Sequence, residues 1–241
     1  MNKNIRCVVI QPDNYKKKKA SFPVVYLLHG YSGNFSNWIT KVPALMNYAD
    51  DYQLIIVCPD GNFSSWYFDS PVDSSSRYET YISKEVVHYI DSAYRTIRDK
   101  DHRAITGLSM GGHGALFLSL RHPDIFGAAG SMSGGVDLSE SKTRFDVTKR
   151  LGDTLSHAKD WHDYSVINLV ENYVNTPVKI IFDCGNKDIF IEGNRGLHKK
   201  MQQLKIPHDY IERPGEHNWV YWSNAIPYEL LFFKRFFYSS K

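Results

Sequence analysis

The sequence is poor in cysteine, which argues against two common ways of stabilising a fold. Its 241 residues contain three cysteines, Cys7, Cys58 and Cys184, and none of them belongs to a Cys-x-x-Cys pair or lies at the spacing of metal ligands. An odd number without such spacing indicates neither a disulfide framework nor a cysteine-based metal centre. Two of the three fall in predicted strands, where cysteine packs as a small hydrophobic residue.

The sequence also lacks a large charge excess and long hydrophobic runs. It has 29 Lys and Arg against 26 Asp and Glu, a formal net charge of +3, which argues against nucleic acid as a partner. The basic run Lys16 to Lys19 lies between two predicted strands and is typical of a solvated hairpin loop. No stretch approaches the length of a membrane span, and no signal peptide precedes the first predicted strand. The chain as it stands is expected to be cytoplasmic, or secreted or periplasmic if a leader has been trimmed.

What the sequence does contain is an alternation of apolar runs and amphipathic segments, the pattern of an α/β sheet. Helix-sized segments separate the intermediate strands, so we expect parallel strands joined by right-handed crossovers. The length suits one domain over residues 1–241. The predicted strands are Ile5–Ile10, Val24–Leu28, Leu54–Cys58, Arg103–Thr106, Ala128–Ser131, Val178–Phe182 and Asp209–Glu212. The predicted helices are Val42–Asp50, Glu79–Tyr94, Gly112–Arg121, Gly193–Leu204 and His217–Tyr238.

Residues 134–176 interrupt this alternation. The segment is polar and rich in Ser and Lys at first, and then carries Trp161, Tyr164 and Tyr173. We expect a cap or lid insertion over the strand ends that is too short to be an independent domain. The segment is a candidate for a mobile lid or for the contact between two copies in a homo-oligomer.

Residues 107–111 read Gly-Leu-Ser-Met-Gly and lie between the predicted strand Arg103–Thr106 and a helical run. A G-x-S-x-G pentapeptide between strand and helix is typical of a nucleophile elbow, which lifts the serine Oγ out of the sheet edge. We expect Gly107 and Gly111 to be small because strand and helix nearly collide there. The helix N-terminus offers free amides and positive potential where an oxyanion forms. Ser109 is therefore the predicted nucleophile, and a pentapeptide that arose by chance is the alternative.

A serine nucleophile needs a general base and an orienting carboxylate, and both follow the serine along the chain in this fold class. We expect His217 to be the base because it directly follows the last predicted strand, in Pro-Gly-Glu-His-Asn-Trp. For the acid we expect Asp188, beyond the end of the preceding strand, in preference to Asp183 at the strand terminus. His113 is expected to cap or pack, and His208 to lie at the opposite edge of the sheet.

An oxyanion hole needs two backbone donors. One is expected to be the amide of Met110, directly after the nucleophile. The other is expected to be the amide of Tyr31, in the loop His-Gly-Tyr-Ser-Gly at residues 29–33, whose glycines allow a close backbone approach. His29 is expected to shape this loop rather than to transfer a proton. A plain glycine-rich turn is the alternative.

Aromatic residues follow another predicted strand, in the loop at residues 60–68. This loop leaves the carboxyl end of the strand, where open α/β sheets bind ligands. Its aromatic side chains could line an acyl or sugar pocket, or they could form a satellite hydrophobic cluster under the loop. The candidates for substrate contact are His29, Trp66, Tyr67, Trp161 and Trp219.

With these motifs the chain resembles the esterase D-like branch of the α/β-hydrolase superfamily. That branch includes tributyrin-type carboxylesterases, feruloyl and acetyl-xylan esterases, S-formylglutathione hydrolases and mycolyltransferases. The resemblance covers nearly the whole chain and rests on Val25–Gly30, Gly107–Ala115, Phe126–Ala129 and the pair Cys184-Gly185 ahead of Asp188. It implies an α/β-hydrolase fold, with a mostly parallel central sheet, helices on both faces and a short cap. It also implies a triad of Ser109, Asp188 and His217, with Tyr31 and Met110 forming the oxyanion hole.

The resemblance implies a serine carboxylesterase that acts on short-chain acyl or hydroxycinnamoyl esters through an acyl-enzyme. Small esters and acylated saccharides, including plant polysaccharide, are the candidate substrates, and the mechanism requires no metal and no cofactor. Acyl transfer and an S-formylglutathione hydrolase-like thioesterase are the alternatives. Thioesterases of that group usually carry a cysteine-containing segment where this chain reads Ser-Gly-Asn-Phe-Ser-Asn-Trp, at residues 32–38. A non-catalytic carbohydrate-binding protein is a remote third hypothesis, because such proteins typically lose a member of the triad.

Overall fold

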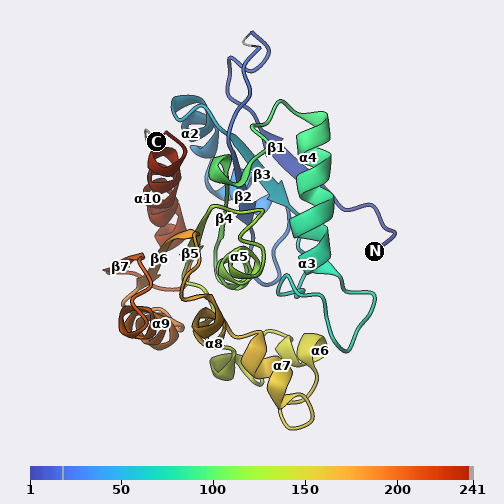
Figure 1. Ribbon diagram of the computed structural model, residues 1–241, viewed down its shortest axis with the longest axis vertical. Helices are drawn as coiled ribbons and strands as arrows, with labels where there is room; N and C mark the ends of the chain where they lie inside the picture. The colour runs from blue at the N-terminus through green and yellow to red at the C-terminus, as the bar shows by residue number, and fades with distance from the viewer. Residues whose placement is uncertain (18, 239–241) are drawn as a thin grey trace.

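In a computed structural model the chain forms a seven-stranded sheet with helices on both faces (Figure 1). The structure describes residues 1–17 and 19–238. The strand order is β1-β3-β2-β4-β5-β6-β7, with β1 antiparallel to β3 and every other pair of neighbours parallel. This is the mostly parallel sheet of the α/β-hydrolase fold, so the predicted fold is confirmed.

Every predicted strand is present, within a few residues of its expected ends. The central strands are buried at every position, which explains why their sequences read as nearly continuous apolar runs. The strands are β1 (Cys7–Ile10), β2 (Val24–Leu28), β3 (Ile55–Pro59), β4 (Arg103–Gly107), β5 (Ala128–Met132), β6 (Lys179–Gly185) and β7 (Asp209–Arg213).

The hairpin predicted around Lys16 to Lys19 is wrong. β1 and β2 do not pair with each other, because β3 lies between them, antiparallel to β1 and parallel to β2. The connection through residues 11–23 is far longer than the short loops that force two successive strands to pair. Lys18 lies outside the described residues.

The helices cover the two faces of the sheet because alternate residues of each strand point to opposite sides. In β2, Val25 and Leu27 pack with the helices on one face, whereas Val24, Tyr26 and Leu28 belong to the core on the other face. The helices on the first face are α1 (Asn37–Lys41), α2 (Leu45–Asp51) and α10 (Trp219–Tyr238). Those on the second are α3 (Tyr78–Thr80), the π-helical η1 (Tyr81–Val86), α4 (Val87–Ala93), α5 (Met110–Arg121) and α9 (Ile191–Gln203). A short 3-10 turn, η2 (Lys100–His102), precedes β4.

Residues 134–176 form a group of short helices beside the carboxyl ends of the parallel strands, at the bottom of Figure 1. They are η3 (Leu138–Ser141), α6 (Val147–Leu151), α7 (Ala158–Asp163), α8 (Val166–Leu169) and η4 (Val170–Tyr173). Leu138, Val147, Leu151 and Val166 are fully buried in the main hydrophobic core, so the segment packs onto the sheet domain. No helix within residues 1–17 and 19–238 is long and apolar enough to cross a lipid bilayer.

Candidate active site

Ser109 lies at the sharp turn between β4 and α5. Its φ of 55° and ψ of −119° fall in a region that non-glycine residues rarely adopt, at a cost on the order of 1–3 kcal/mol. The neighbouring backbone holds it there. The Ser109 amide donates to the Met132 carbonyl at 2.9 Å, and the Ser109 carbonyl accepts from the His113 amide at 3.0 Å. The strained turn is therefore fixed by β5 and by the first turn of α5.

The two glycines of the pentapeptide allow β4, α5 and the loop after β2 to touch. A Cβ on Gly107 would lie 2.7 Å from the backbone carbonyl group of Gly111, and a Cβ on Gly111 would lie 2.5 Å from the His29 carbonyl oxygen. Real Cβ atoms do not approach backbone atoms so closely, so both positions require glycine. The expected near-collision of strand and helix is confirmed.

Ser109, His217 and Asp188 form one hydrogen-bonded chain. The His217 Nε2 lies 2.9 Å from the Ser109 Oγ, and the His217 Nδ1 lies 2.9 Å from each carboxylate oxygen of Asp188. A carboxylate only accepts hydrogen bonds, so the proton of the neutral imidazole sits on Nδ1 and Nε2 is left to accept from the serine hydroxyl. The structure thus brings together the three residues predicted as a triad, in an arrangement that can activate a serine for nucleophilic attack.

The loops that carry Asp188 and His217 are joined through their backbones. The Lys187 amide donates to the Gly215 carbonyl at 2.9 Å, and a Cβ on Gly185 would lie 2.5 Å from that same oxygen. The Asp188 carboxylate is fully buried and also accepts from the Phe190 amide at 2.9 Å. These contacts fix the distance between the carboxylate and the imidazole.

The amides of Tyr31 and Met110 are both free to donate. Met110 is the first residue of α5, where an amide has no acceptor within the helix. Within residues 1–17 and 19–238 the Tyr31 amide donates to no protein acceptor. The backbone that leads to it touches the nucleophile, since a Cβ on Gly30 would lie 3.3 Å from the Ser109 Cβ. Both amides therefore remain candidates for an oxyanion hole.

A hollow of about 400 Å³ opens above Ser109, a size typical of small-molecule sites. Several aromatic side chains contribute to its wall. The Tyr31 ring packs edge-on against the rings of Phe63 and Phe145, with centroids 4.9 and 5.5 Å away, and the His217 ring packs edge-on against Trp222 at 4.9 Å. The lining residues include Gly30, Tyr31, Phe145, His217, Trp219 and Trp222. Among the described residues no cluster of His, Cys, Asp or Glu is arranged to hold a metal ion.

Comparison with known proteins shows the family of this chain. A family model described as "Putative esterase" matches residues 1–233. The chain belongs to this esterase family. An esterase of Mycobacterium tuberculosis is 27% identical over 235 residues, which cover 87% of this chain and 51% of the relative. This chain thus spans about half the length of that relative.

Two further relatives of this esterase-family protein match over nearly their whole length. The acetyl esterase of Caldicellulosiruptor saccharolyticus is 23% identical over 245 residues, covering 94% of this chain and 91% of the relative. A solved structure of a ferulic acid esterase superposes with a TM-score of 0.85 at 29% identity, covering 98% of this chain and 94% of that chain. The family resemblance expected from the sequence is confirmed.

Three other polar residues of this esterase-family chain were considered for the site, and their contacts are structural: Asp183, His113 and His208. Asp183 is fully buried in β6, 3.6 Å from the Arg213 guanidinium, and burial raises its pKa to about 7. His113 is fully buried, donates from Nδ1 to the Gly135 carbonyl at 3.1 Å, and has its pKa lowered to about 3 by burial. His208 lies 2.8 Å from His198, next to the edge strand β7. None of the three makes a hydrogen bond to Ser109 or His217 within the described chain.

Three of the five predicted substrate contacts are wrong because their side chains are buried, and the two others stay predictions. Trp219 lines the hollow, but Trp161 lines a separate hollow within residues 134–176, and His29, Trp66 and Tyr67 are at most 1% exposed. Trp66 and Tyr67 have φ values of 54° and 61°, which turn the loop after β3 inward and place both rings in the main core. They therefore form neither a pocket wall nor a satellite cluster.

Sequence reasoning missed two aromatic residues that do line the hollow, Phe145 and Trp222. Phe145 lies in the irregular stretch between η3 and α6, where no periodicity marks it. Trp222 could have been found, because it follows Trp219 by three positions in α10 and residues so spaced share a helix face.

Proposed function

We propose that the protein is a serine carboxylesterase that works through an acyl-enzyme. The observation that carries this proposal is the hydrogen-bonded chain from the Ser109 Oγ through His217 to the buried Asp188 carboxylate, at the floor of an open hollow. Membership of an esterase family and the similarity to an acetyl esterase and a ferulic acid esterase support it.

In the first half-reaction His217 Nε2 takes the Ser109 hydroxyl proton while Oγ forms a bond to the ester carbonyl carbon. The tetrahedral oxyanion accepts hydrogen bonds from the amide of Tyr31, in the loop after β2, and from the amide of Met110, at the N-terminal end of α5. When this intermediate collapses, the bond to the alcohol oxygen breaks and His217 returns its proton to that oxygen.

In the second half-reaction a water molecule attacks the acyl carbon while His217 Nε2 takes its proton. The new tetrahedral intermediate uses the same two amides, and its collapse breaks the bond to the Ser109 Oγ, which recovers its proton from His217. The Asp188 carboxylate takes up no proton and stabilises the imidazolium, because its two oxygens each lie 2.9 Å from Nδ1.

For the substrate we propose short-chain acyl or hydroxycinnamoyl esters, including esters on saccharides. The aromatic wall formed by Tyr31, Phe145 and Trp219 favours a planar or short apolar acyl group over a charged one. The relatives named acetyl esterase and ferulic acid esterase represent these two acyl classes.

The test is hydrolysis of p-nitrophenyl esters of increasing length beside methyl ferulate and acetylated xylan. We expect activity on acetyl or feruloyl esters, labelling by a fluorophosphonate probe, and a loss on the order of 10⁶ in kcat for Ser109→Ala. Full activity of the Ser109→Ala variant, or no labelling of the wild-type protein, would overturn the proposal. Products formed in the presence of added alcohols or sugars would identify acyl transfer.

A further inference from the structure

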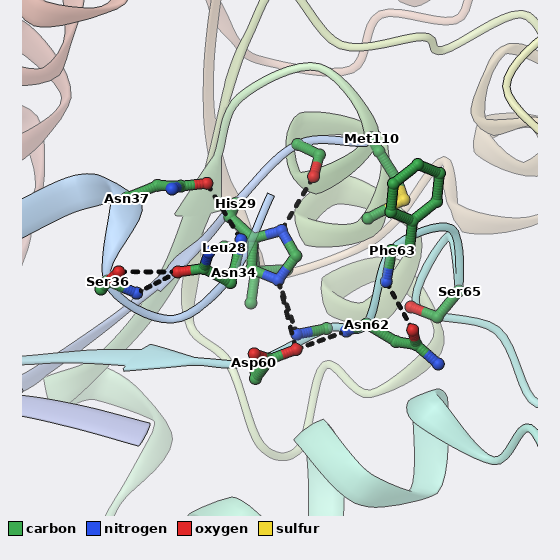
Figure 2. Close-up of polar contacts among 12 residues, drawn as sticks. Leu28, His29, Asn34, Ser36, Asn37, Asp60, Asn62, Phe63, Ser65 and Met110 are labelled. Atoms are coloured by element: carbon green, nitrogen blue, oxygen red, sulfur yellow. Dashed lines mark hydrogen bonds and ion pairs between the residues drawn. The ribbon is translucent and has the colours of Figure 1, made fainter. Parts of the chain in front are cut away.

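His29 is buried beside the loop that carries the Tyr31 amide, and a role for it rests on the proposed function because that function requires an oxyanion hole. Figure 2 shows the imidazole of His29 between the loop that carries Asp60 and Asn62 and the loop that carries Asn34 and Ser36. The ring is 1% exposed, so it cannot reach a substrate in the hollow. Its two nitrogens are nevertheless both engaged, each with a backbone group.

These contacts fix the protonation of the ring. The His29 Nε2 lies 2.7 Å from the Gly61 amide nitrogen, and a backbone amide can only donate. Nε2 must therefore be the unprotonated acceptor, and the proton of the neutral ring is on Nδ1. From there it is donated to the Gly30 carbonyl oxygen at 2.8 Å. The nearest carboxylate is Asp60, whose Oδ1 lies 3.8 Å from Nε2 and accepts from the Asn62 amide at 2.8 Å.

The carbonyl that His29 holds belongs to the same peptide unit as the Tyr31 amide. In a trans peptide the C=O and the N–H point in opposite directions, and the described chain contains no cis peptide bond. A hydrogen bond that turns the Gly30 carbonyl toward His29 therefore turns the Tyr31 amide away from it, toward the hollow that Gly30, Tyr31 and Ser109 line. The Gly33 amide donates to the same carbonyl at 3.1 Å.

Two more aromatic side chains hold the preceding carbonyls of this loop. The Trp38 Nε1–H donates to the Leu28 carbonyl at 3.0 Å, and the Tyr67 hydroxyl donates to the His29 carbonyl at 2.9 Å. Three successive carbonyls are thus each fixed by a buried ring. This also explains why His29 and Tyr67 are buried rather than exposed to substrate.

We propose that His29 is a positioning residue that aims the Tyr31 amide into the oxyanion hole by holding the Gly30 carbonyl. The Gly61 amide serves this role indirectly, because it selects the tautomer that places the proton on Nδ1. His29 takes no part in proton transfer with the substrate.

Two variants separate this role from a general structural one. In His29→Asn the side-chain amide nitrogen takes the place of Nδ1, so donation to Gly30 is retained and the contact with Gly61 is lost. In His29→Gln the terminal oxygen takes the place of Nε2, so the contact with Gly61 is retained and donation to Gly30 is lost. We expect His29→Gln to lose up to ~10²-fold in kcat, as for a weakened oxyanion donor, with KM changed only a few-fold. His29→Asn should retain most of kcat.

The readout specific to the oxyanion is the affinity for an aryl trifluoromethyl ketone, whose adduct with a serine carries a tetrahedral oxyanion. His29→Gln should weaken this affinity by the same factor as kcat, whereas Tyr67→Phe should weaken it less because it frees a different peptide unit. Equal kcat in the two His29 variants, or a loss of thermal stability without a change in inhibitor affinity, overturns the positioning role. If wild-type hydrolysis does not depend on Ser109, the proposed function itself has failed. That result differs from a failure of the positioning role, in which hydrolysis still depends on Ser109.

Discussion

The Trp66 indole Nε1–H donates a hydrogen bond of 2.8 Å to the carbonyl oxygen of Phe145. This bond joins the loop after β3 to the stretch between η3 and α6, and so holds one wall of the hollow above Ser109. Phe145 and the next residue, Asp146, have φ values of 58° and 56°. Two successive residues in the left-handed region keep that conformation only when their surroundings impose it, and the Trp66 bond is one such contact.

We predict that Phe145→Ala changes the acyl preference. Removing the ring takes away an aromatic contact in the hollow, so kcat/KM for methyl ferulate should fall by roughly 2- to 10-fold more than kcat/KM for p-nitrophenyl acetate. Trp66→Phe should shift the preference in the same direction because the wall loses its anchor. Phe63→Ala is the matched control, since Phe63 also contacts the Tyr31 ring but does not line the hollow. An equal effect of Phe63→Ala and Phe145→Ala would contradict this prediction.

Asp188→Asn should lower kcat by about 10⁴-fold with little change in KM. The asparagine keeps the size of the carboxyl group but offers an N–H toward the imidazole, which favours the tautomer that cannot accept the Ser109 proton. Steady-state kinetics with p-nitrophenyl acetate measures both constants. Asp183→Asn is the comparison, because Asp183 is the other candidate acid and makes no hydrogen bond to His217 in the described chain. If Asp183→Asn has the larger effect, the acid has been assigned to the wrong residue.

The chain order and the strand ends made the triad predictable. The carboxyl ends of parallel strands meet at one edge of the sheet, so Ser109, Asp188 and His217 could be placed together from their positions after β4, β6 and β7. The orientation of Trp66 and Tyr67 could not be predicted in this way. Both lie in a loop whose direction depends on two left-handed residues, and a non-glycine sequence carries little signal for that conformation.

The pairing of β1 and the role of His29 depend on long-range contacts. β1 is separated from its partner β3 by β2 in the chain, and its alternation of residues is equally compatible with either neighbour. His29 was expected to shape its loop, but its bond to the Gly61 amide joins two loops whose approach no local pattern encodes. The helix α1 was missed because a five-residue helix is too short to show a 3.6-residue period.

Gly111→Ala should destabilise the protein by about 1–3 kcal/mol or more, the usual cost of overpacking. The new methyl group would lie 2.5 Å from the His29 carbonyl oxygen, which belongs to a backbone that three hydrogen-bonded rings hold in place. Gly196→Ala, also in a helix, is the control. Its methyl group would meet only the flexible end of Ile167, at 3.1 Å, so a gain of about 0.5–1 kcal/mol is expected. Urea unfolding measures both, and a Gly111→Ala protein as stable as wild type would contradict the packing described.

Glu229→Gln should change how stability depends on pH. Glu229 is fully buried in α10 and bonded to the Thr106 hydroxyl, and burial raises its pKa well above the ordinary value. As pH rises above about 4.5, the unfolded chain releases this proton while the folded protein retains it, so the free energy of unfolding falls. Glutamine removes this dependence.

The difference in Tm between Glu229→Gln and wild type should therefore shift in favour of the variant as the pH rises above about 4.5. Burial also raises the pKa of Asp183 to about 7, so Asp183 likewise lowers the free energy of unfolding as the pH rises. This contribution remains in the variant. Thermal unfolding followed by circular dichroism at several pH values provides the comparison. A difference in Tm that is independent of pH would show that Glu229 is ionised in the folded protein.

The backbone contacts between the loops after β6 and β7 bear on how this protein could be altered by insertion or by grafting. Because the Lys187 amide binds the Gly215 carbonyl and Gly185 leaves no space between the two loops, a residue inserted into either loop would displace both the carboxylate and the imidazole. A chimaera with a related esterase would have to exchange these two loops together.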